Sequence, residues 1–317
     1  MNKHSFSNNS TAGLLSVFAK KCFAVRVFFS QTFFGLYYRK IKAMLFKLKR
    51  YCIYYTESYD SFDAKTVSNI PIDLVFITID KDFEILQMSI ESAKKYVKHP
   101  ISRIVIVTRE DEMYRNFCDE NGYVFIDETT ILGYGKNQLP DELTCPKGHF
   151  LQQMLKLGYD KFSSVDNYLV LDSDTIYVKP RVFMHNGKTF FDYSDEYHFP
   201  YRKAYRELMG FDYDSRKSFV CHYMLYNKQK LKHFKDITEK RHNLRWDEAY
   251  IKSRDHSSMY CISEFESYGN FFKHFYGKEM KRRYWFNEEV GALEGFNNKF
   301  PKYARSVSCH SYFRGKY

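Results

Sequence analysis

The sequence predicts an α/β protein whose mostly parallel, Rossmann-like sheet carries helices on both faces, followed by a less regular α+β half. Four apolar runs between residues 71 and 172 have the composition of strands that are buried on both faces. Segments with helical spacing of their apolar residues separate these runs. With 317 residues and 44% hydrophobic residues, the chain can fill one large core and still carry an appendage.

The first two predicted strands are PIDLVFITID (71–80) and SRIVIVTR (102–109), and the predicted helix DFEILQMSIESAKKYV (82–97) lies between them. DEMYRNFCDENG (111–122) is expected to be a helix closed by its Asn-Gly pair, because glycine readily adopts the left-handed conformation that ends a helix. YVFIDE (123–128) has the composition of a third strand. These five segments therefore alternate between strand and helix.

The alternation continues with a helix over GHFLQQMLKLGYDKF (148–162) and a fourth strand over NYLVLD (167–172). It is typical of a parallel sheet, in which ligands bind beyond the carboxyl ends of the strands. After Pro180 the pattern is irregular, as expected of an α+β half. The elements expected there are KTFF (188–191), RKAYRELMG (202–210), SFVCHYMLY (218–226) and RWDEAYIKS (245–253).

The net charge of +11 is concentrated at the two ends of the chain. Residues 1–56 contain ten Lys or Arg and no Asp or Glu, whereas residues 57–271 are slightly acidic. Such a distribution is typical of a protein that contacts an anionic surface. The seven cysteines are scattered singly without a CxxC pair, so neither a zinc ribbon nor a disulfide framework is expected, and a reducing compartment fits.

Residues 1–56 form a predicted basic arm, and residues 57–317 form the predicted main domain. The arm fits neither a signal peptide nor a membrane span, because its longest uncharged apolar-rich run has twelve residues (27–38), where a span needs about 20. Residues 37–55 instead predict an amphipathic helix. Its apolar face comprises Tyr37, Tyr38, Ile41, Met44, Leu45, Leu48, Cys52 and Tyr55, and its cationic face comprises Arg39, Lys40, Lys42, Lys47, Lys49 and Arg50.

This helix favours peripheral contact with an anionic membrane surface, where each basic residue contributes roughly 1 kcal/mol. A helix packed on the main domain or used in an oligomer contact is the alternative, although such helices usually carry mixed charge on the wet face. Nucleic-acid binding is not expected, because no recognisable reader module accompanies the positive charge.

Two carboxylates, Asp172 and Asp174, close the fourth predicted strand in NYLVLDSDTIYVKP (167–180). Like charges this close repel unless a cation neutralises them, and Mg²⁺ and Mn²⁺ prefer carboxylate oxygens. The same spacing occurs at 80–82 and 212–214, so the triplet alone is weak evidence. The pair at 172 and 174 stands apart because it lies between an apolar strand and a resumed strand, which favours a divalent-cation site over a solvated turn.

In this context YLVLDSDTIYVKP resembles the DxD segment of GT-A glycosyltransferases. Three further segments agree in order, HFLQQMLKL before it and SFVCHYMLYNKQKL and SEFESYGNF after it. Together they resemble an uncharacterised family of GT-A-like proteins from bacterial surface-polysaccharide loci. The resemblance covers roughly residues 70–317 and leaves out the arm.

The resemblance implies a nucleotide-sugar donor and a divalent metal, Mn²⁺ or Mg²⁺, that bridges the DxD motif to the donor diphosphate. By this analogy Asp174 would bind the metal directly, and Asp172 would contact the metal, a bound water or the donor ribose. Several GT-A families add a histidine near the C-terminus, which is His310 here, although a surface histidine is the alternative. Arg314 would hold phosphate oxygens unless it belongs to a solvated basic end.

An inverting transferase needs a carboxylate that removes the proton of the acceptor hydroxyl. The motif SEFESYGNF offers Glu264 and Glu266, which share a side-chain direction only in a strand, so we expect one base and favour Glu266. Asp247 in RWDEAY is the rival candidate. The alternative for the glutamates is a buried carboxylate that satisfies backbone amides.

Further donor contacts are expected from the helix over 148–162 and from the first strand. His149, Gln153 and Lys156 share one helical face beside the DxD strand, from which they could reach the donor sugar or phosphate. Thr78 and Asp80 share one face at the end of the first strand, where GT-A folds hold the nucleotide base. An ordinary solvated surface is the alternative for both groups.

These features together predict a metal-dependent glycosyltransferase of the hexosyltransferase type on the cytoplasmic face of the cell membrane, extending a surface glycan such as capsule or lipopolysaccharide. Its partners would be a nucleotide-sugar donor, a glycan or lipid-linked glycan acceptor, and the anionic membrane. A nucleotidyl- or phosphotransferase on the same fold is one alternative, weakened because the sequence has no GxxxxGK[ST] loop. A non-catalytic glycan- or membrane-binding protein is the other.

Overall fold

The computed structural model describes residues 33–57, 59–213, 216–297 and 299–310, the side chains of residues 33–36 excepted. The contacts within the chain divide it into two compact units, Met1–Thr56 and Glu57–Tyr317. Each unit is described by itself below.

The described part of the first unit is one helix, α2 (Phe33–Thr56), which confirms the helix expected over residues 37–55. Most apolar side chains of the predicted face are exposed, among them Tyr37 at 60% and Leu48 at 58%. Within the described ranges, no helix combines the length and the apolar character needed to cross a membrane. The apolar face that the sequence predicts for this helix is therefore exposed to solvent within its unit.

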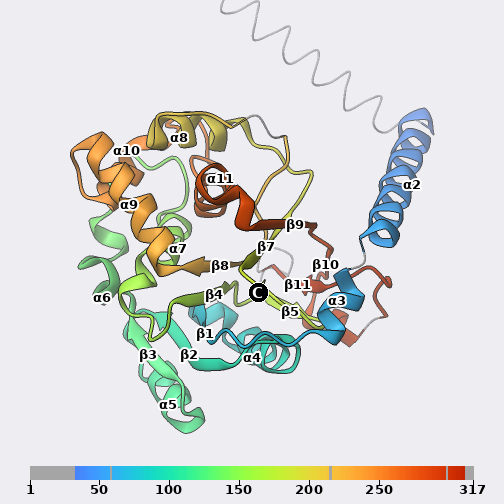
Figure 1. Cartoon of the computed structure of the whole chain (residues 1–317), viewed down its shortest axis with the longest axis horizontal. Helices are drawn as coiled ribbons and strands as arrows, with labels where there is room; N and C mark the ends of the chain where they lie inside the picture. Colours follow the sequence, from blue (N-terminus) through green and yellow to red (C-terminus); the bar gives the residue numbers. More distant parts are fainter. Residues whose placement is uncertain (1–32, 58, 214–215, 298, 311–317) are drawn as a thin grey trace, which may run out of the picture. The chain divides into compact units, whose positions relative to one another are not determined.

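The second unit is built on a five-stranded sheet with the order β3-β2-β1-β4-β8 (Figure 1). Its strands are β1 (Ile72–Ile77), β2 (Ile101–Thr108), β3 (Val124–Asp127), β4 (Asn167–Leu171) and β8 (Tyr223–Asn227). The first four are parallel, and β8 pairs with β4 in the antiparallel sense. The predicted class, a mostly parallel α/β sheet, is confirmed.

Helices cover both faces of this sheet, because alternate strand residues enter two different cores. The helices are α4 (Phe83–Tyr96), α5 (Glu112–Asn121), α6 (Glu128–Leu132), α7 (Lys147–Gly158), α8 (Phe199–Met209), α9 (Lys228–His242), α10 (Trp246–Ser253) and α11 (Glu264–Tyr276). Leu74 and Ile104 pack with α4 and α5, whereas their strand neighbours Val75 and Val105 pack with helices from α7 to α11. Figure 1 shows these two groups of helices on opposite sides of the sheet.

Two predicted strands are shorter than expected. The first ends at Ile77, and Asp80–Asp82 forms a single 3₁₀ turn, because the charged sequence DKD turns towards solvent rather than extending the buried strand. Residues 218–222 precede β8 instead of belonging to it. By contrast, α5 ends as predicted at Gly122, whose φ of +66° is the left-handed conformation that glycine tolerates.

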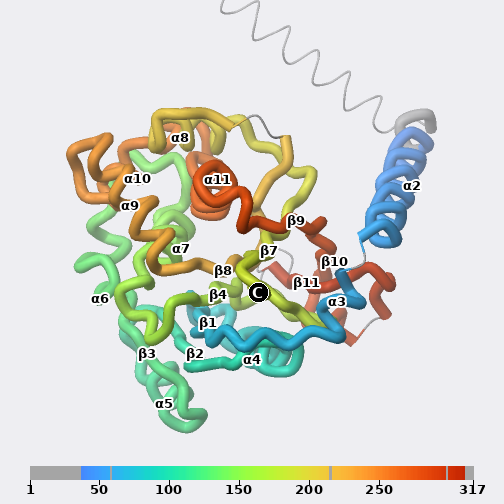
Figure 2. The backbone as a smooth tube through the Cα atoms, in the orientation of Figure 1, coloured from blue at the N-terminus to red at the C-terminus, as the bar shows by residue number. Residues whose placement is uncertain are grey.

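Two small sheets and a short helix complete the second unit. One sheet contains β5 (Thr175–Tyr177), β10 (Asn287–Glu289) and β11 (Ser306–Ser308), and the other contains β6 (Met184–His185), β7 (Lys188–Tyr193) and β9 (Met280–Tyr284). Figure 2 shows the chain leaving β4 for β5 and returning near its end to place β11 beside β5. The remaining helices are α3 (Tyr59–Lys65) and the 3₁₀ segments Lys136–Gln138, Tyr159–Lys161, Gly277–Glu279 and Leu293–Asn297.

A buried network of charges joins these small elements to the main sheet. The fully buried Arg181 and Arg283 both donate to Asp192 in β7, with 2.6 Å between Arg181 Nη2 and Asp192 Oδ2. Arg283 also donates to Asp63 in α3 at 3.1 Å, and the Tyr223 hydroxyl of β8 donates to Asp192. Both Arg181 and Arg283 therefore have an acidic partner, as a buried charge requires.

Candidate active site

Asp172 and Asp174 lie in the turn between β4 and β5, at the carboxyl end of the parallel strands. The Asp172 N–H donates to the His222 carbonyl at 2.8 Å, and the Thr175 N–H donates to the Asp172 carbonyl at 3.1 Å. The Cys309 N–H donates to the Asp174 carbonyl at 3.0 Å. These bonds fix the turn between the start of β8 and the C-terminal segment. The sheet edge on which they meet is the one where α/β sheets bind ligands.

Asp174 and His310 are neighbours although 136 residues separate them in the sequence, with 2.9 Å between Asp174 Oδ2 and His310 Nδ1. The pairing of β11 with β5, in which Ser308 lies opposite Thr175, brings the two side chains together. Burial would lower the pKa of His310, but the hydrogen bond and charge of Asp174 outweigh burial and raise that pKa above its ordinary value.

A second histidine, His222, supports this pair. Its ring centroid is 4.8 Å from that of His310, at an interplanar angle of 77°. His222 Nδ1 lies 2.5 Å from Ser308 Oγ and 3.0 Å from Thr175 Oγ1, so His222 ties β11 to β5. Burial lowers the pKa of His222 to about 4, which keeps the ring neutral at pH 7.

Lys156 of α7 connects the acidic turn to α11. Its Nζ lies 2.8 Å from both Asp172 Oδ1 and Glu264 Oε1, and 4.3 Å from the centre of the Phe265 ring. The residue is only 4% exposed. Burial would lower the pKa of Lys156, but the two carboxylates outweigh burial and raise it, so the ammonium stays charged. Burial also raises the pKa of Asp172, and the charge of Lys156 opposes that shift.

The predicted face of α7 forms as expected, but its three residues have different surroundings. Gln153 is buried, with its Nε2 3.1 Å from His149 Nε2 and its Oε1 accepting the Tyr250 hydroxyl at 2.7 Å. Lys156 pairs with the carboxylates described above. His149 is the exposed member of the three and therefore the one most open to a ligand.

Glu264 and Glu266 begin helix α11, so they point in different directions, since two helical residues two positions apart are about 200° apart. Glu264 faces Lys156. Glu266 accepts the Phe219 N–H at 3.2 Å and the Asn270 side-chain amide at 2.7 Å. Burial raises the pKa of Glu266 to about 7. Only Glu264 is thus linked to the DxD turn by the contacts that the structure shows.

Asp247, the third predicted carboxylate, lies in α10 and is held by two neighbours. The Arg245 guanidinium donates to both of its oxygens, and the Tyr134 hydroxyl donates to Oδ2 at 2.6 Å. A cavity of about 50 Å³ lies beside it, lined also by Trp246 and Gly158. Both oxygens of the Asp247 carboxylate are therefore already hydrogen-bonded, to Arg245 and to Tyr134.

The residues expected at the nucleotide base follow β1. Thr78 is buried, and its N–H donates to the Val107 carbonyl at 3.0 Å. Asp80 lies in the 3₁₀ turn and pairs with Arg109, which follows β2. Both therefore lie at the carboxyl edge of the sheet, although not on one strand face. Arg314, expected to hold phosphate, lies outside the described residues.

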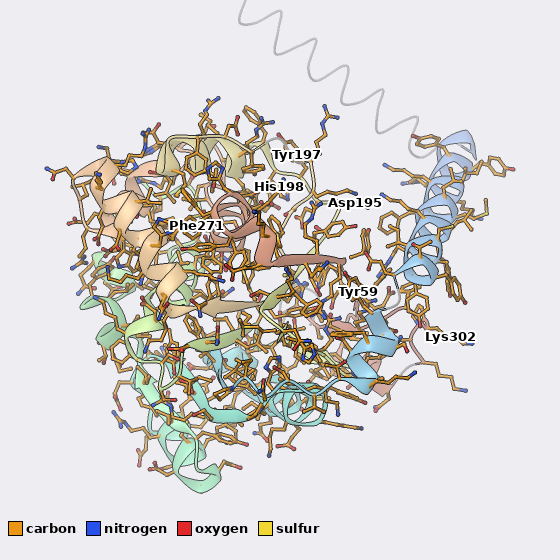
Figure 3. All side chains as sticks on the ribbon, in the orientation of Figure 1. Tyr59, Asp195, Tyr197, His198, Phe271 and Lys302 are labelled. Atoms are coloured by element: carbon orange, nitrogen blue, oxygen red, sulfur yellow. The ribbon has the colours of Figure 1, made fainter. Side chains whose placement is uncertain are left out.

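An exposed, largely aromatic surface, which sequence reasoning missed, lies on the segments that lead into α8 and α11. Tyr197, Phe199, Met259 and Tyr260 are exposed there, and His198 is partly buried. The His198 ring stacks on Tyr260 with centroids 4.7 Å apart and 26° between the planes, and Figure 3 labels His198 beside Tyr197. Tyr201 packs against His198 at 5.1 Å. Burial raises the pKa of Tyr201, and the charge of Glu264 adds to this rise.

The geometry of Asp174 and His310 suits two adjacent ligands of one divalent cation. Ligand atoms about 2.1 Å from Mg²⁺ and at right angles are about 3 Å apart, close to the 2.9 Å between Asp174 Oδ2 and His310 Nδ1. Within the described part of the chain, no group of three or more His, Cys, Asp or Glu side chains is arranged to hold a metal. Because Mg²⁺ commonly completes its shell with phosphate oxygens and water, the pair fits a cation that binds together with a diphosphate.

The chain is similar to one family model and, in fold, to several solved structures. Residues 67–295 match the model of a family of unknown function, DUF6492. A search of curated proteins finds no match. Among solved structures, mouse xyloside xylosyltransferase 1 gives a TM-score of 0.44 at 8% identity, over 78% of this chain and 100% of that one. The galactosyltransferase LgtC gives 0.41 at 15% (75% and 87%), and GlyE of Streptococcus pneumoniae TIGR4 gives 0.35 at 13% (68% and 45%).

Proposed function

This chain belongs to DUF6492, a family of unknown function, and we propose that it is a metal-dependent glycosyltransferase that uses a nucleotide-sugar donor. The observation that carries the proposal is the Asp174–His310 pair, 2.9 Å apart next to Asp172, at the ligand-binding edge of a parallel sheet. Two remote segments of the chain bring a carboxylate and an imidazole together there, which is a donor set for a divalent cation.

Asp174 and His310 would hold the cation, and Asp172 would lie behind it, fixed by Lys156. When bound, the cation would neutralise the donor diphosphate and the charge on the departing nucleoside diphosphate. Lys156 is proposed to orient Asp172, and its charge opposes the rise that burial imposes on the pKa of Asp172. His149, exposed on the same helix, is proposed to contact the donor sugar or phosphate.

Thr78 and Asp80 are proposed to border the nucleotide base. The support is their position after β1, whose carboxyl end neighbours that of β4 in the sheet. Arg314 is the proposed phosphate ligand in the segment that follows His310.

On the acceptor side we propose Glu264 as the carboxylate that meets the acceptor hydroxyl. Lys156 links Glu264 to Asp172, whereas Glu266 and Asp247 are hydrogen-bonded to other parts of the fold. Tyr260, four residues before Glu264 in the sequence, is 48% exposed and offers a flat ring of the kind on which sugar rings stack. The proposed acceptor is therefore a glycan that rests on the aromatic surface around Tyr260.

We further propose that α2 keeps the enzyme at the cytoplasmic face of the cell membrane, where the acceptor is a membrane-bound or lipid-linked surface glycan. Support comes from the exposed apolar side chains of α2, such as Tyr38 and Met44, and from the absence of acidic residues throughout positions 1–56. Confinement to the membrane plane would raise the encounter rate with such an acceptor.

The test is hydrolysis of a panel of UDP- and GDP-sugars by the purified chain with Mn²⁺. We expect slow release of UDP or GDP from at least one donor, and a loss of about 100-fold or more in Asp174→Asn, since a group that stabilises the developing charge contributes this much. Asp212→Asn is the matched control, because Asp212 has the same Asp-x-Asp spacing but pairs with Arg202.

Wild-type protein that hydrolyses none of the donors, or an Asp174→Asn variant as active as wild type, would contradict the proposal. Turnover of nucleoside triphosphates without any sugar would instead favour a nucleotidyl- or phosphotransferase.

A further inference from the structure

Two cysteines that are 116 residues apart in the sequence meet in the second unit. Cys145 Sγ and Cys261 Sγ are 3.1 Å apart, and both side chains are buried. Cys145 lies two residues before α7, and Cys261 lies three residues before α11. Neither residue is in a helix or a strand. A disulfide has an S–S distance of about 2.05 Å, so each sulfur needs to move by only about half an ångström.

The surroundings of the pair favour Cys145 as the first attacking sulfur, because the hydrogen bond to Cys145 and burial raise the pKa of the Cys261 thiol. The Cys261 thiol donates a hydrogen bond to the Cys145 sulfur, which lowers the pKa of the Cys145 thiol, while burial opposes this and the charge of Arg254 adds to it. A thiolate is the attacking species in thiol–disulfide exchange. The flanking Thr144 and Tyr260 are exposed, so a local opening of these surface segments would admit a small reagent.

We propose that Cys145 and Cys261 form a reversible intrachain disulfide, with a small disulfide such as oxidised glutathione as the oxidant. The Cys145 thiolate attacks one glutathione sulfur and releases the first glutathione thiolate. The Cys261 thiolate then attacks the Cys145 sulfur of this mixed disulfide and releases the second. The two protons of the protein thiols end on two molecules of reduced glutathione, so the two electrons also pass to glutathione.

The bond would join the segments that enter α7 and α11, the two helices that carry Lys156 and Glu264. The Thr144 hydroxyl already donates to the Ser258 carbonyl, so the two segments are held side by side in the reduced protein. Closing so long a loop restricts the unfolded chain strongly, and we expect the melting temperature to rise by about 5–10 °C on oxidation.

The experiment treats the reduced full-length protein with oxidised glutathione, blocks the remaining thiols, and maps peptides without reduction. We expect a linked peptide that contains Cys145 and Cys261, a higher melting temperature, and reversal of both by dithiothreitol. Cys261→Ser and Cys145→Ser should abolish the linked peptide and the shift, and Cys118→Ser, a buried cysteine packed among Tyr114 and Leu86, should keep both.

Oxidised wild-type protein in which Cys145 and Cys261 remain reduced, carry only glutathione, or pair with other cysteines would overturn the proposal. The mapping is read on wild-type protein, so it stays decisive even if a serine variant does not fold. Since it measures a covalent bond and not turnover, it is also independent of the proposed glycosyltransferase activity.

Discussion

At the residue scale, the site is a row of ionisable side chains in which His310 pairs with Asp174, and Lys156 pairs with both Asp172 and Glu264. Lys156 is the critical member, because it is buried and is the cation shared by the buried Glu264 and the partly buried Asp172. Removing one partner of such a group leaves uncompensated charge in the interior, which costs far more than losing a surface pair.

We therefore expect Lys156→Met to lower the free energy of unfolding by about 3–5 kcal/mol, because Asp172 and Glu264 would then face each other without a cation. Urea denaturation at pH 7 measures this change. Lys161→Met, on the nearby surface, is the matched control and should change stability by about 0.5 kcal/mol or less. Equal stability of the two variants would refute the role given to Lys156.

Glu266 provides a pH test. Its pKa is raised by burial from 4.5 in the unfolded chain to about 7 in the folded one. Below pH 4.5 both states hold the proton and the group has no effect, but as the pH rises to 7 the unfolded state loses its proton first. Wild-type stability should therefore fall by about 3 kcal/mol between pH 4.5 and 7 through this group, with little further change above pH 7.

In Glu266→Gln this contribution should be absent. Urea denaturation of both proteins at pH 5 and pH 8 checks it, because the variant should gain on wild type at the higher pH. If the wild-type protein instead gains stability relative to Glu266→Gln as the pH rises, the pKa of Glu266 is not raised on folding.

Residue patterns predicted part of this site. Asp172 and Asp174 were recognisable because a buried strand rarely ends on two carboxylates and then resumes, and the contact of Asp174 with His310 agrees with the histidine that the resemblance implies near the C-terminus. The contacts of Lys156 with Asp172 and Glu264 could not be predicted from the sequence. They depend on how α7 packs against remote segments, which no local pattern indicates. The same holds for His222, whose contacts with Thr175, Ser308 and His310 join segments that are remote in the sequence.

At the element scale, the start of α11 decides which glutamate faces the site. The stretch SEFE has the Ser-x-x-Glu pattern of a helix start, and the Ser263 hydroxyl accepts the Glu266 N–H at 3.3 Å. That local signal predicts the helix and therefore the divergence of Glu264 and Glu266. The packing of Phe219 against Gly269 of α11 could not be predicted, because Phe219 comes from a distant segment of the chain.

The fit of α11 against Phe219 leads to a stability prediction. A Cβ at Gly269 would lie 2.5 Å from Phe219 Cγ, so Gly269→Ala should destabilise the protein by about 1–3 kcal/mol through overpacking. Gly148→Ala in α7 meets no atom within 4 Å and should be neutral or stabilising by up to about 1 kcal/mol. Thermal unfolding compares the two variants, and a Gly269→Ala protein as stable as Gly148→Ala would show that this contact is loose.

At the scale of the whole molecule, almost all of the net positive charge lies in residues 1–56, while the second unit is nearly neutral because its slightly acidic residues 57–271 precede a basic C-terminal part. The parallel core was predictable because doubly buried strands read as continuous apolar runs. The small sheets were harder to predict, because their strands have only two to six residues and pair with remote partners such as β7 with β9. The boundary between the two contact units lies at Thr56, one residue before the first acidic residue of the chain.

The membrane proposal predicts charge-dependent binding to vesicles. Replacing Lys40, Lys42 and Lys47 by Gln should weaken binding to phosphatidylglycerol vesicles by about 100-fold, since each basic residue contributes about 1 kcal/mol. A control with the same charge change, at Lys161, Lys240 and Lys252, should bind nearly as wild type. Sedimentation with vesicles at low and high salt measures the binding of both variants. If both lose the same amount of vesicle binding, α2 is not the membrane-binding element.

The most direct test of the central claim is the binding of Mn²⁺ to the purified protein, followed by electron paramagnetic resonance in the presence of UDP or GDP. We expect saturable binding that falls at least about tenfold in Asp174→Asn and in His310→Ala, with Asp212→Asn unchanged. Binding should tighten from pH 6 to pH 8, because the raised pKa of His310 means that a proton competes with the metal. Wild-type protein that binds no Mn²⁺ beside either nucleotide, or binding that survives both substitutions, would contradict the account.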